Sequence, residues 1–274
     1  PMSRGEELWA QGFSEPGAGS DLSNVRTKAR LENGEWIIEG QKIWTSFAQH
    51  ADWAFVVCRT EEGSRGPKGL SYLLVPMRQP GVTVRPITTL VNDQHFCETF
   101  FDGARTAADN VLGEAGGGWS VTTGTLIFER GASTLGQQML FRTELSEVID
   151  AAKANGAYER ADIRQRIAEA YAGLKIMRYT ALRMMSNAER GQMSLEGYTY
   201  KLYYAQWHQK LGELAMDVLG AQAEISDNPS YHFHGPAHTF LNSRSASIYA
   251  GTNQIQRNII SERALGLPRE PRGT

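Results

Sequence analysis

The sequence predicts an α+β protein, with an antiparallel β-barrel or sandwich followed by an antiparallel four-helix bundle. The first part holds short runs of β-branched and aromatic residues, separated by Gly, Pro and Asn turn signals. After Gly116-Gly117-Gly118 the runs become long, and no proline occurs between Pro86 and Pro229. We therefore expect a β domain at residues 1–115 and a helical domain at residues 116–274.

Five runs in the first part have strand character. Between two extended runs, Asn33-Gly34 favours a type I′ hairpin turn, because both residues tolerate a positive φ angle. The five strand-like runs are residues 36–38, 53–58, 70–75, 82–84 and 96–101.

The second part has helical periodicity over four long segments. Asn155-Gly156 and Arg190-Gly191 are typical helix stops, since Gly or Asn after the last turn can adopt the left-handed cap conformation. Four helices of this length favour an antiparallel bundle. The predicted helices are residues 118–153, 160–190, 196–225 and 240–265.

Composition limits the classes of partner. Of the 274 residues, 41% are apolar, and 28 Lys and Arg balance 30 Asp and Glu to a net charge of −2. No basic run favours nucleic acid, and no apolar run reaches membrane-spanning length. Cys58 and Cys97 have no metal-ligand or disulfide spacing, so we expect no metal site and a reducing, cytoplasmic location.

Two polar segments could bind a ligand. The stretch QGFSEPGAGSDL has small residues that allow backbone amides to approach a ligand, although an ordinary turn is favoured when it is taken alone. The stretch GQKIWTS places Trp44 next to two hydroxyl residues, Thr45 and Ser46. A tryptophan flanked by hydroxyls could lie against a planar ring; the alternative is a half-buried strand Trp.

Five blocks together resemble the acyl-CoA dehydrogenase family. They are SEPGAGSDL, GEWIIEGQKIWTS, the Gly118-Trp119 entry to a helix, LGAQAEI and SIYAGTNQIQRNIISERALG, in the order of the family and across nearly the whole chain. The resemblance implies a β middle domain and a C-terminal helical bundle. The family's N-terminal helical domain has no counterpart here, and the abrupt, Met-less start favours a fragment of a longer protein.

The resemblance implies FAD as the cofactor. Phe13 and Ser14 match contacts to the pyrimidine edge of the flavin, by backbone or hydroxyl. Trp44 and Ser46 match the residues beside the flavin ring and its N5 atom, with Ser46 in place of a more common Thr.

Other matched positions concern the rest of the cofactor and the thioester. Ser20 matches a residue near the pantetheine arm and the flavin phosphates, and Thr252 and Gln254 match contacts to the adenosine diphosphate part. The loop from Gly220 to Gln222 matches one that meets the flavin of a neighbouring subunit.

One family block is missing. An Arg-x-x-Phe-Gly stretch often follows the first bundle helix and holds FAD, but this region reads AKANGAYERADIRQR. Arg160, Arg164 or Arg166 could reach phosphate instead, although a solvated charge cluster at a helix start is favoured.

The family reaction needs a base for the proton α to the thioester carbonyl, and donors for the carbonyl oxygen. The carboxylate that often precedes Gly-Thr is replaced by Ala250, whose backbone N–H can still serve the thioester oxygen. The resemblance also places Arg130, Tyr249 and Gly251 at the substrate.

Glu129 is the predicted base. By periodicity its helix neighbours are small or apolar, and from the residues alone an exposed Glu is favoured. However, Leu126, Glu129 and Arg130 match the isovaleryl-CoA and long-chain acyl-CoA dehydrogenases, in which the base lies on this helix and the C-terminal position is Ala or Gly. The main alternative is a subunit without its own base.

The expected reaction forms a trans-2-enoyl-CoA from an acyl-CoA in fatty-acid β-oxidation, with electrons passed to electron-transfer flavoprotein. The family's shared flavin site implies a homodimer or homotetramer. Two alternatives stay open: a non-catalytic subunit of a heteromeric dehydrogenase, and a flavin oxidase or monooxygenase. The His-rich stretch YHFHGPAH is interpreted as a loop.

Overall fold

The computed structural model describes residues 1–132, 134–190, 194–224 and 235–269, with the backbone alone at residues 128–132. The chain divides into two compact units. One comprises Pro1–Thr89 with Asp93–Leu126, and the other comprises Leu90–Asn92 with Ile127–Thr274. A β domain followed by a helical domain is therefore confirmed.

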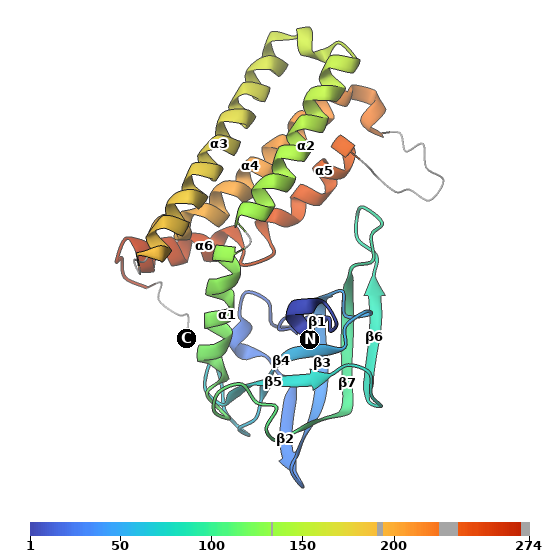
Figure 1. Cartoon of the computed structure of the whole chain (residues 1–274), viewed down its shortest axis with the longest axis vertical. Helices are drawn as coiled ribbons and strands as arrows, with labels where there is room; N and C mark the ends of the chain where they lie inside the picture. Colours follow the sequence, from blue (N-terminus) through green and yellow to red (C-terminus); the bar gives the residue numbers. More distant parts are fainter. Residues whose placement is uncertain (133, 191–193, 225–234, 270–274) are drawn as a thin grey trace. The chain divides into compact units, whose positions relative to one another are not determined.

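Seven strands form a single sheet in the first unit (Figure 1). The five predicted runs all lie in strands. The additional strand β1 is short and contains a glycine, and β2 is rich in charged residues, so neither has a full strand pattern. The strands are β1 (Trp9–Gly12), β2 (Lys28–Glu32), β3 (Glu35–Ser46), β4 (Trp53–Arg59), β5 (Leu70–Pro76), β6 (Val82–Ile87) and β7 (Phe96–Ala107).

The predicted hairpin is confirmed between β2 and β3. Glu32 pairs with Glu35, and the two residues between them, Asn33 and Gly34, have φ angles of 51° and 84°. Both central residues of a type I′ turn need a positive φ angle, so this turn sets the register of the two strands.

The sheet is mixed rather than wholly antiparallel. Its order is β1-β4-β2-β3-β7-β6, and β5 pairs with β4 on the other side. β1 runs parallel to β4 with Trp9 opposite Trp53, and β2 meets β4 in parallel at Lys28 and Arg59. Apolar patterns show which residues are buried but not strand direction, so the sequence does not reveal these parallel pairings.

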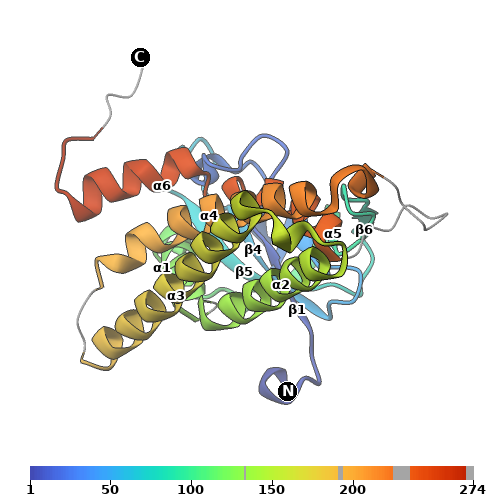
Figure 2. The ribbon, with the colours of Figure 1, turned by 90° about the horizontal axis from the view of Figure 1, so that it is seen from above.

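Six α-helices are described, connected in places by short 3-10 turns (Figures 1 and 2). The predicted segment 118–153 is described as α1 and α2, on either side of residue 133, which lies outside the described residues. The helices are α1 (Gly118–Ala132), α2 (Thr134–Ala154), α3 (Ala161–Glu189), α4 (Glu196–Leu219), α5 (Gly235–Ser243) and α6 (Asn253–Ile259).

The predicted helix at residues 240–265 is wrong. α5 ends at Ser243, and a 3-10 turn (Arg244–Ser247) and an irregular turn separate it from α6. Within the irregular turn Ala250 and Gly251 have φ angles of 50° and 88°, which no α-helix tolerates. A π-helical turn, Ile260–Ala264, follows α6.

Two further boundaries differ from the prediction. α4 ends at Leu219 instead of residue 225, because Gly220 adopts a φ angle of 58° at the helix end. Residues 231–234 of the His-rich stretch lie outside the described residues, but Gly235 to His238 begin α5, so the loop interpretation is wrong for those four.

The bundle consists of α2, α3, α4 and α5. α4 contacts each of the other three helices, and α2 contacts α3. Apolar side chains of α2, α3 and α4 form most of one buried cluster, which includes Phe141, Leu145, Met177 and Leu211. The predicted four-helix bundle is thus confirmed, and α2 and α4 each contact the other three helices.

Candidate active site

A buried ion pair fixes the loop after β1. The Nζ atom of Lys42, on β3, lies 2.8 Å from Oε1 of Glu15 and donates a second hydrogen bond to the carbonyl oxygen of Phe13 at 3.0 Å. Glu15 also accepts hydrogen bonds from the backbone N–H groups of Arg26 and Thr27, at 2.6 and 2.8 Å. Lys42 is fully buried and the Glu15 side chain is 7% exposed, so the pair is shielded from solvent.

This environment favours the ionised form of Glu15. Burial alone would raise the pKa of its carboxyl group. The attraction of Lys42 and the hydrogen bonds from Lys42, Thr27 and Arg26 outweigh burial, so the pKa of Glu15 lies below its ordinary value. The carboxylate therefore stays charged and holds the loop at neutral pH.

The loop itself is a tight turn against β3. Glu15 and Ala18 exchange two backbone hydrogen bonds of 3.0 Å, and Ser14 accepts one from the N–H of Ile43 at 2.9 Å. The Phe13 ring is buried against Phe55. Only the backbone of Phe13 can therefore make the predicted contact with a flavin. Ser14 is half-buried, and Ser20 is exposed.

Trp44 projects from an irregular point of β3. The register between β3 and β7 shifts between Lys42 and Thr45, and Trp44 takes a φ angle of 61°. A left-handed conformation costs a bulky residue roughly 1–2 kcal/mol. The Trp44 side chain is nonetheless 54% exposed, with its ring edge-on to Phe96 at 5.9 Å. Ser46, two residues further, is exposed at the end of β3, so both predicted ring contacts are accessible within this unit.

The turn before α6 presents a backbone N–H group that has no acceptor in the described parts of the chain. Ala250 and Gly251 are both left-handed, and the buried side chain of Gln256 donates a hydrogen bond to the Ala250 carbonyl at 3.1 Å. No acceptor for the Ala250 N–H is found among the residues that the structure describes. This N–H can therefore bind a ligand oxygen.

Three residues near this turn, Tyr249, Thr252 and Gln254, are predicted to contact the substrate or the cofactor. The Tyr249 side chain is 42% exposed, and its hydroxyl accepts a hydrogen bond from Gln137 at 3.3 Å. Thr252 caps α6 by accepting a bond from the N–H of Ile255 at 3.2 Å, and Gln254 is exposed on α6. Sequence reasoning missed Gln137 and Gln256. Gln137 lies 112 positions from Tyr249, so no local pattern indicates that contact.

Glu129 and Arg130 lie near the end of α1, but their side chains are outside those that the structure describes. Earlier on the same helix, Thr122 is buried, and Leu126 packs against an apolar cluster of the β unit. The placement of Glu129 as the base stays a prediction.

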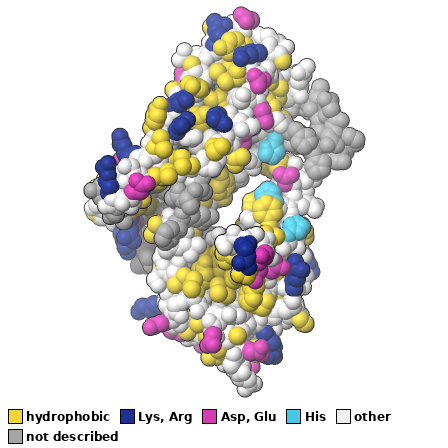
Figure 3. Space-filling model, viewed as in Figure 1, with side chains coloured by type: hydrophobic (Ala, Val, Ile, Leu, Met, Phe, Trp, Pro, Cys, Tyr) yellow, Lys and Arg dark blue, Asp and Glu magenta, His cyan; other side chains and the backbone are white. Residues whose placement is uncertain are grey.

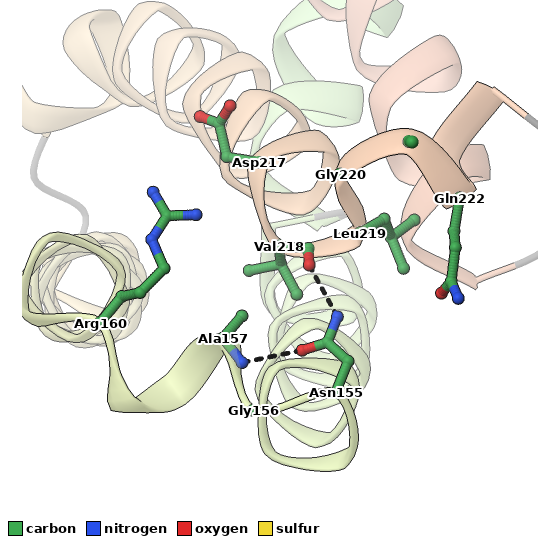
Figure 4. Close-up of a pocket in the computed structure, with 10 residues that line it drawn as sticks. Asn155, Gly156, Ala157, Arg160, Asp217, Val218, Leu219, Gly220 and Gln222 are labelled. Carbon is green, nitrogen blue, oxygen red and sulfur yellow. Dashed lines mark hydrogen bonds between the residues drawn. The ribbon is translucent and has the colours of Figure 1, made fainter.

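A hollow of about 460 Å³ opens at one end of the bundle (Figure 4). Asn155 shapes it by donating a hydrogen bond to the carbonyl of Val218 at 2.7 Å and accepting one from the N–H of Ala157 at 3.0 Å. Arg160 and Gln222 lie on opposite sides of it. Its lining consists of Asn155, Gly156, Ala157, Arg160, Asp217, Val218, Leu219, Gly220, Ala221 and Gln222.

Of the three arginines considered for phosphate, only Arg160 lines this hollow. Its exposed side chain pairs with Asp162 at 2.7 Å. Arg164 instead donates to the carbonyls at the end of the preceding turn, and Arg166 pairs with Asp217 at 2.5 Å. Arg160 and the loop from Gly220 to Gln222 therefore face one shared space.

Other chemistry is not indicated in the described parts of the chain. Both cysteines are buried, and burial raises the pKa of the Cys58 thiol to about 12, so it is unreactive at neutral pH. No group of three or more described His, Cys, Asp or Glu residues could hold a metal ion. No helix in the described ranges is long and apolar enough to cross a membrane.

Residues 10–104 match the acyl-CoA dehydrogenase middle domain, and residues 116–265 match the acyl-CoA dehydrogenase C-terminal domain. The chain therefore belongs to the acyl-CoA dehydrogenase family, whose members are FAD-dependent oxidoreductases. Among its relatives, the acyl-CoA dehydrogenase IpdE1 of Mycobacterium tuberculosis is 49% identical over 267 residues, which cover 97% of this chain and 69% of IpdE1. IpdE1 of Mycolicibacterium smegmatis is 50% identical, with the same coverage.

Two similar solved structures are complexes of two different chains. The steroid acyl-CoA dehydrogenase Tcur3481-Tcur3483 is 28% identical, with a TM-score of 0.87 over 97% of this chain and 70% of that chain. The ChsE4-ChsE5 complex from Mycobacterium tuberculosis is also 28% identical, with a TM-score of 0.85 over 98% of this chain and 71% of that chain.

Proposed function

We propose that this chain catalyses the α,β-dehydrogenation of an acyl-CoA thioester to the trans-2-enoyl-CoA, with Glu129 as the base. The observation that carries the proposal is the turn at Ala250, which offers a backbone N–H without an acceptor among the described residues. Such a donor suits a carbonyl oxygen that gains negative charge as the α-proton leaves.

Each group has one task. The Ala250 N–H donates to the thioester oxygen and so increases the acidity of the α-carbon. The Glu129 carboxylate accepts the α-proton, while the β-hydrogen departs with its electron pair. Bound FAD supplies the acceptor for that hydride. Arg130, Tyr249 and Gly251 border the substrate, and Ser20 contacts its pantetheine arm.

The residues of the β unit fit the flavin ring. The exposed indole of Trp44 offers a flat apolar surface. Ser46, two residues further along the chain, offers an exposed hydroxyl group. Phe13 and Ser14 contribute through the anchored loop. The cost of holding Trp44 in a left-handed conformation supports a role in binding, because such strain is concentrated at functional sites.

The residues of the helical unit fit the adenosine diphosphate part. The Thr252 hydroxyl accepts one backbone hydrogen bond and still has its own O–H donor for a phosphate oxygen, and Gln254 is exposed beside it. The hollow at Gly220 and Gln222 suits the cofactor of a neighbouring subunit. Arg160 supplies the cation that the missing Arg-x-x-Phe-Gly stretch would otherwise provide.

The experiment that tests this proposal is anaerobic bleaching of the flavin in the full-length, FAD-loaded protein by a panel of acyl-CoAs. Glu129→Gln should slow bleaching by at least about 10³-fold, since it removes the base. Glu147→Gln, at an exposed position on α2, is the matched control and should bleach like the wild type. Unchanged bleaching in Glu129→Gln would exclude Glu129 as the base.

The electron acceptor belongs to the same proposal. Electrons pass to electron-transfer flavoprotein, so reoxidation of the reduced protein by oxygen alone should be slow. A rapid reaction with oxygen in stopped flow would favour an oxidase.

Residues 1–115 and 116–274 are proposed as the two domains.

A second candidate is a subunit of a heteromeric acyl-CoA dehydrogenase. The two-chain complexes named above favour it, as do apolar side chains exposed on α3 away from the bundle core. Tyr171, Tyr179 and Leu182 are 51%, 64% and 45% exposed, and Figure 3 shows hydrophobic side chains interspersed with Lys and Arg over the helices. A second acyl-CoA dehydrogenase chain, identical or different, would cover this face.

Mass photometry of the full-length protein tests this surface. Leu182→Asp should shift the assembly toward smaller species, whereas Arg164→Ala, elsewhere on α3, should not. An unchanged mass distribution in Leu182→Asp would exclude the α3 face from the interface.

A further inference from the structure

A buried lysine lies next to the proposed thioester-binding turn. Lys201, on α4, is 4% exposed, and its Nζ atom donates a hydrogen bond to the carbonyl oxygen of Ala246. The same ammonium group lies 5.1 Å from the ring centre of Tyr249 and 5.5 Å from that of Tyr204. A carbonyl oxygen and two aromatic rings are thus among the groups around Lys201, and all three attract a cation.

We propose that Lys201 is a positioning residue for the thioester site, and that it sets the direction of the Ala250 N–H by holding Ala246 and Tyr249. This inference rests on the proposed function. The ammonium group holds the chain at two points, four residues and one residue before Ala250. Gln256 holds the Ala250 carbonyl from the other side.

The turn requires such support, because it is strained. Ala250 has a φ angle of 50°, a left-handed conformation that costs an alanine roughly 1–2 kcal/mol. Backbone hydrogen bonds join Tyr249 to Ser245 and Thr252 to Gln256, but none is found for Ala250 or Gly251 among the described residues. Side-chain contacts to the turn therefore help to set the direction of the Ala250 N–H.

A purely structural role explains the lysine less well. A methionine would fill a similar volume without the cost of removing a charge from water, which is several kcal/mol. Burial raises the pKa of Tyr204, so its ring stays neutral and serves as a face for the cation. The ammonium group thus binds two of the residues that lead to Ala250, namely Ala246 and Tyr249.

The test compares Lys201→Met with Lys210→Met, an exposed lysine of the same helix, in the full-length, FAD-loaded protein. Two probes are used: acetoacetyl-CoA, which has a thioester carbonyl, and S-butyl-CoA, a thioether without one. Lys201→Met should lower the affinity for acetoacetyl-CoA about tenfold, because one charge-oriented hydrogen bond is lost. The affinity for S-butyl-CoA should stay within about twofold of the wild-type value. Lys210→Met should change neither.

Hydrogen exchange gives a readout that needs no ligand. Backbone amides of residues 247–251 should exchange faster in Lys201→Met than in the wild type, while those of α2 and α3 should not change. Lys201→Gln, which keeps a donor for Ala246 but lacks the charge, should give intermediate results. It also provides a test if Lys201→Met folds poorly.

An equal loss of affinity for both CoA probes would overturn the positioning role. Unchanged amide hydrogen exchange at residues 247–251 in both Lys201 variants would also overturn it. A different result would indicate a failure of the proposed function itself: the wild type would bind acetoacetyl-CoA no better than S-butyl-CoA. That result would also remove Lys201 from thioester binding, whatever the exchange rates.

Discussion

Lys42 and Glu15 form a buried ion pair, with 2.8 Å between Nζ and Oε1, that ties the loop after β1 to β3 within the β unit. The loop holds Phe13 and Ser14, and the strand continues to Trp44 and Ser46. The ion pair therefore joins the two segments that carry the four predicted flavin contacts of this unit. A pair with complete hydrogen bonding is stable as it stands, but either partner alone would be a buried, uncompensated charge.

We accordingly expect Lys42→Met to lower the free energy of unfolding by about 3–5 kcal/mol. Removing the ammonium group leaves the Glu15 carboxylate buried with only two backbone donors. Urea unfolding followed by tryptophan fluorescence would measure the change. Lys28→Met, at an exposed position on β2, is the matched control and should stay within about 0.5 kcal/mol of the wild type. A similar small effect in Lys42→Met would show that the pair is dispensable.

The same pair predicts a pH dependence of stability. The pKa of Glu15 is lower in the folded protein than in the unfolded chain, so its contribution is complete above the ordinary pKa of 4.5. The contribution is lost as the pH falls below that value and through the folded-state pKa. The difference in unfolding free energy between wild type and Glu15→Gln should be constant from pH 7 to about 6 and shrink below about pH 4.5. A difference that does not vary with pH would contradict the assignment.

The sequence was informative where structure depends on neighbouring residues. Asn33 and Gly34 specify a turn by their own backbone preferences, and the apolar runs mark the strands. The Glu15 and Lys42 pair joins residues 27 positions apart, so no local pattern reveals it. The mistaken helix at residues 240–265 had a usable signal, since Gly251 followed by Thr252 has the features of a helix stop and a new N-cap. The conformation of Ala250 had none, because alanine ordinarily favours a helix.

Arg160 offers a prediction about cofactor affinity. If it replaces the missing family arginine, Arg160→Ala should weaken FAD binding about tenfold, because a cation facing a diphosphate contributes a charge-assisted hydrogen bond. Isothermal titration of the full-length apoprotein with FAD would measure this. Arg178→Ala, exposed on α3 away from the hollow, should leave the affinity unchanged. Equal affinities for the two variants would exclude Arg160 from the cofactor site.

Gly251 provides the sharpest test of the turn. Its φ angle of 88° is strained for any residue with a side chain, and a Cβ atom there would lie 2.6 Å from Nε2 of Gln256. Gly251→Ala should therefore displace Gln256 from the Ala250 carbonyl and lower the unfolding free energy by about 1–2 kcal/mol. Gly266→Ala is the control, since Gly266 has a similar φ angle of 66° but open space where its Cβ would lie. Both variants share the backbone strain, so only Gly251→Ala should also lower kcat/KM, by about tenfold for the loss of one oriented donor. Equal losses of kcat/KM in the two variants would show that backbone strain, and not the contact between Gln256 and Ala250, controls the reaction.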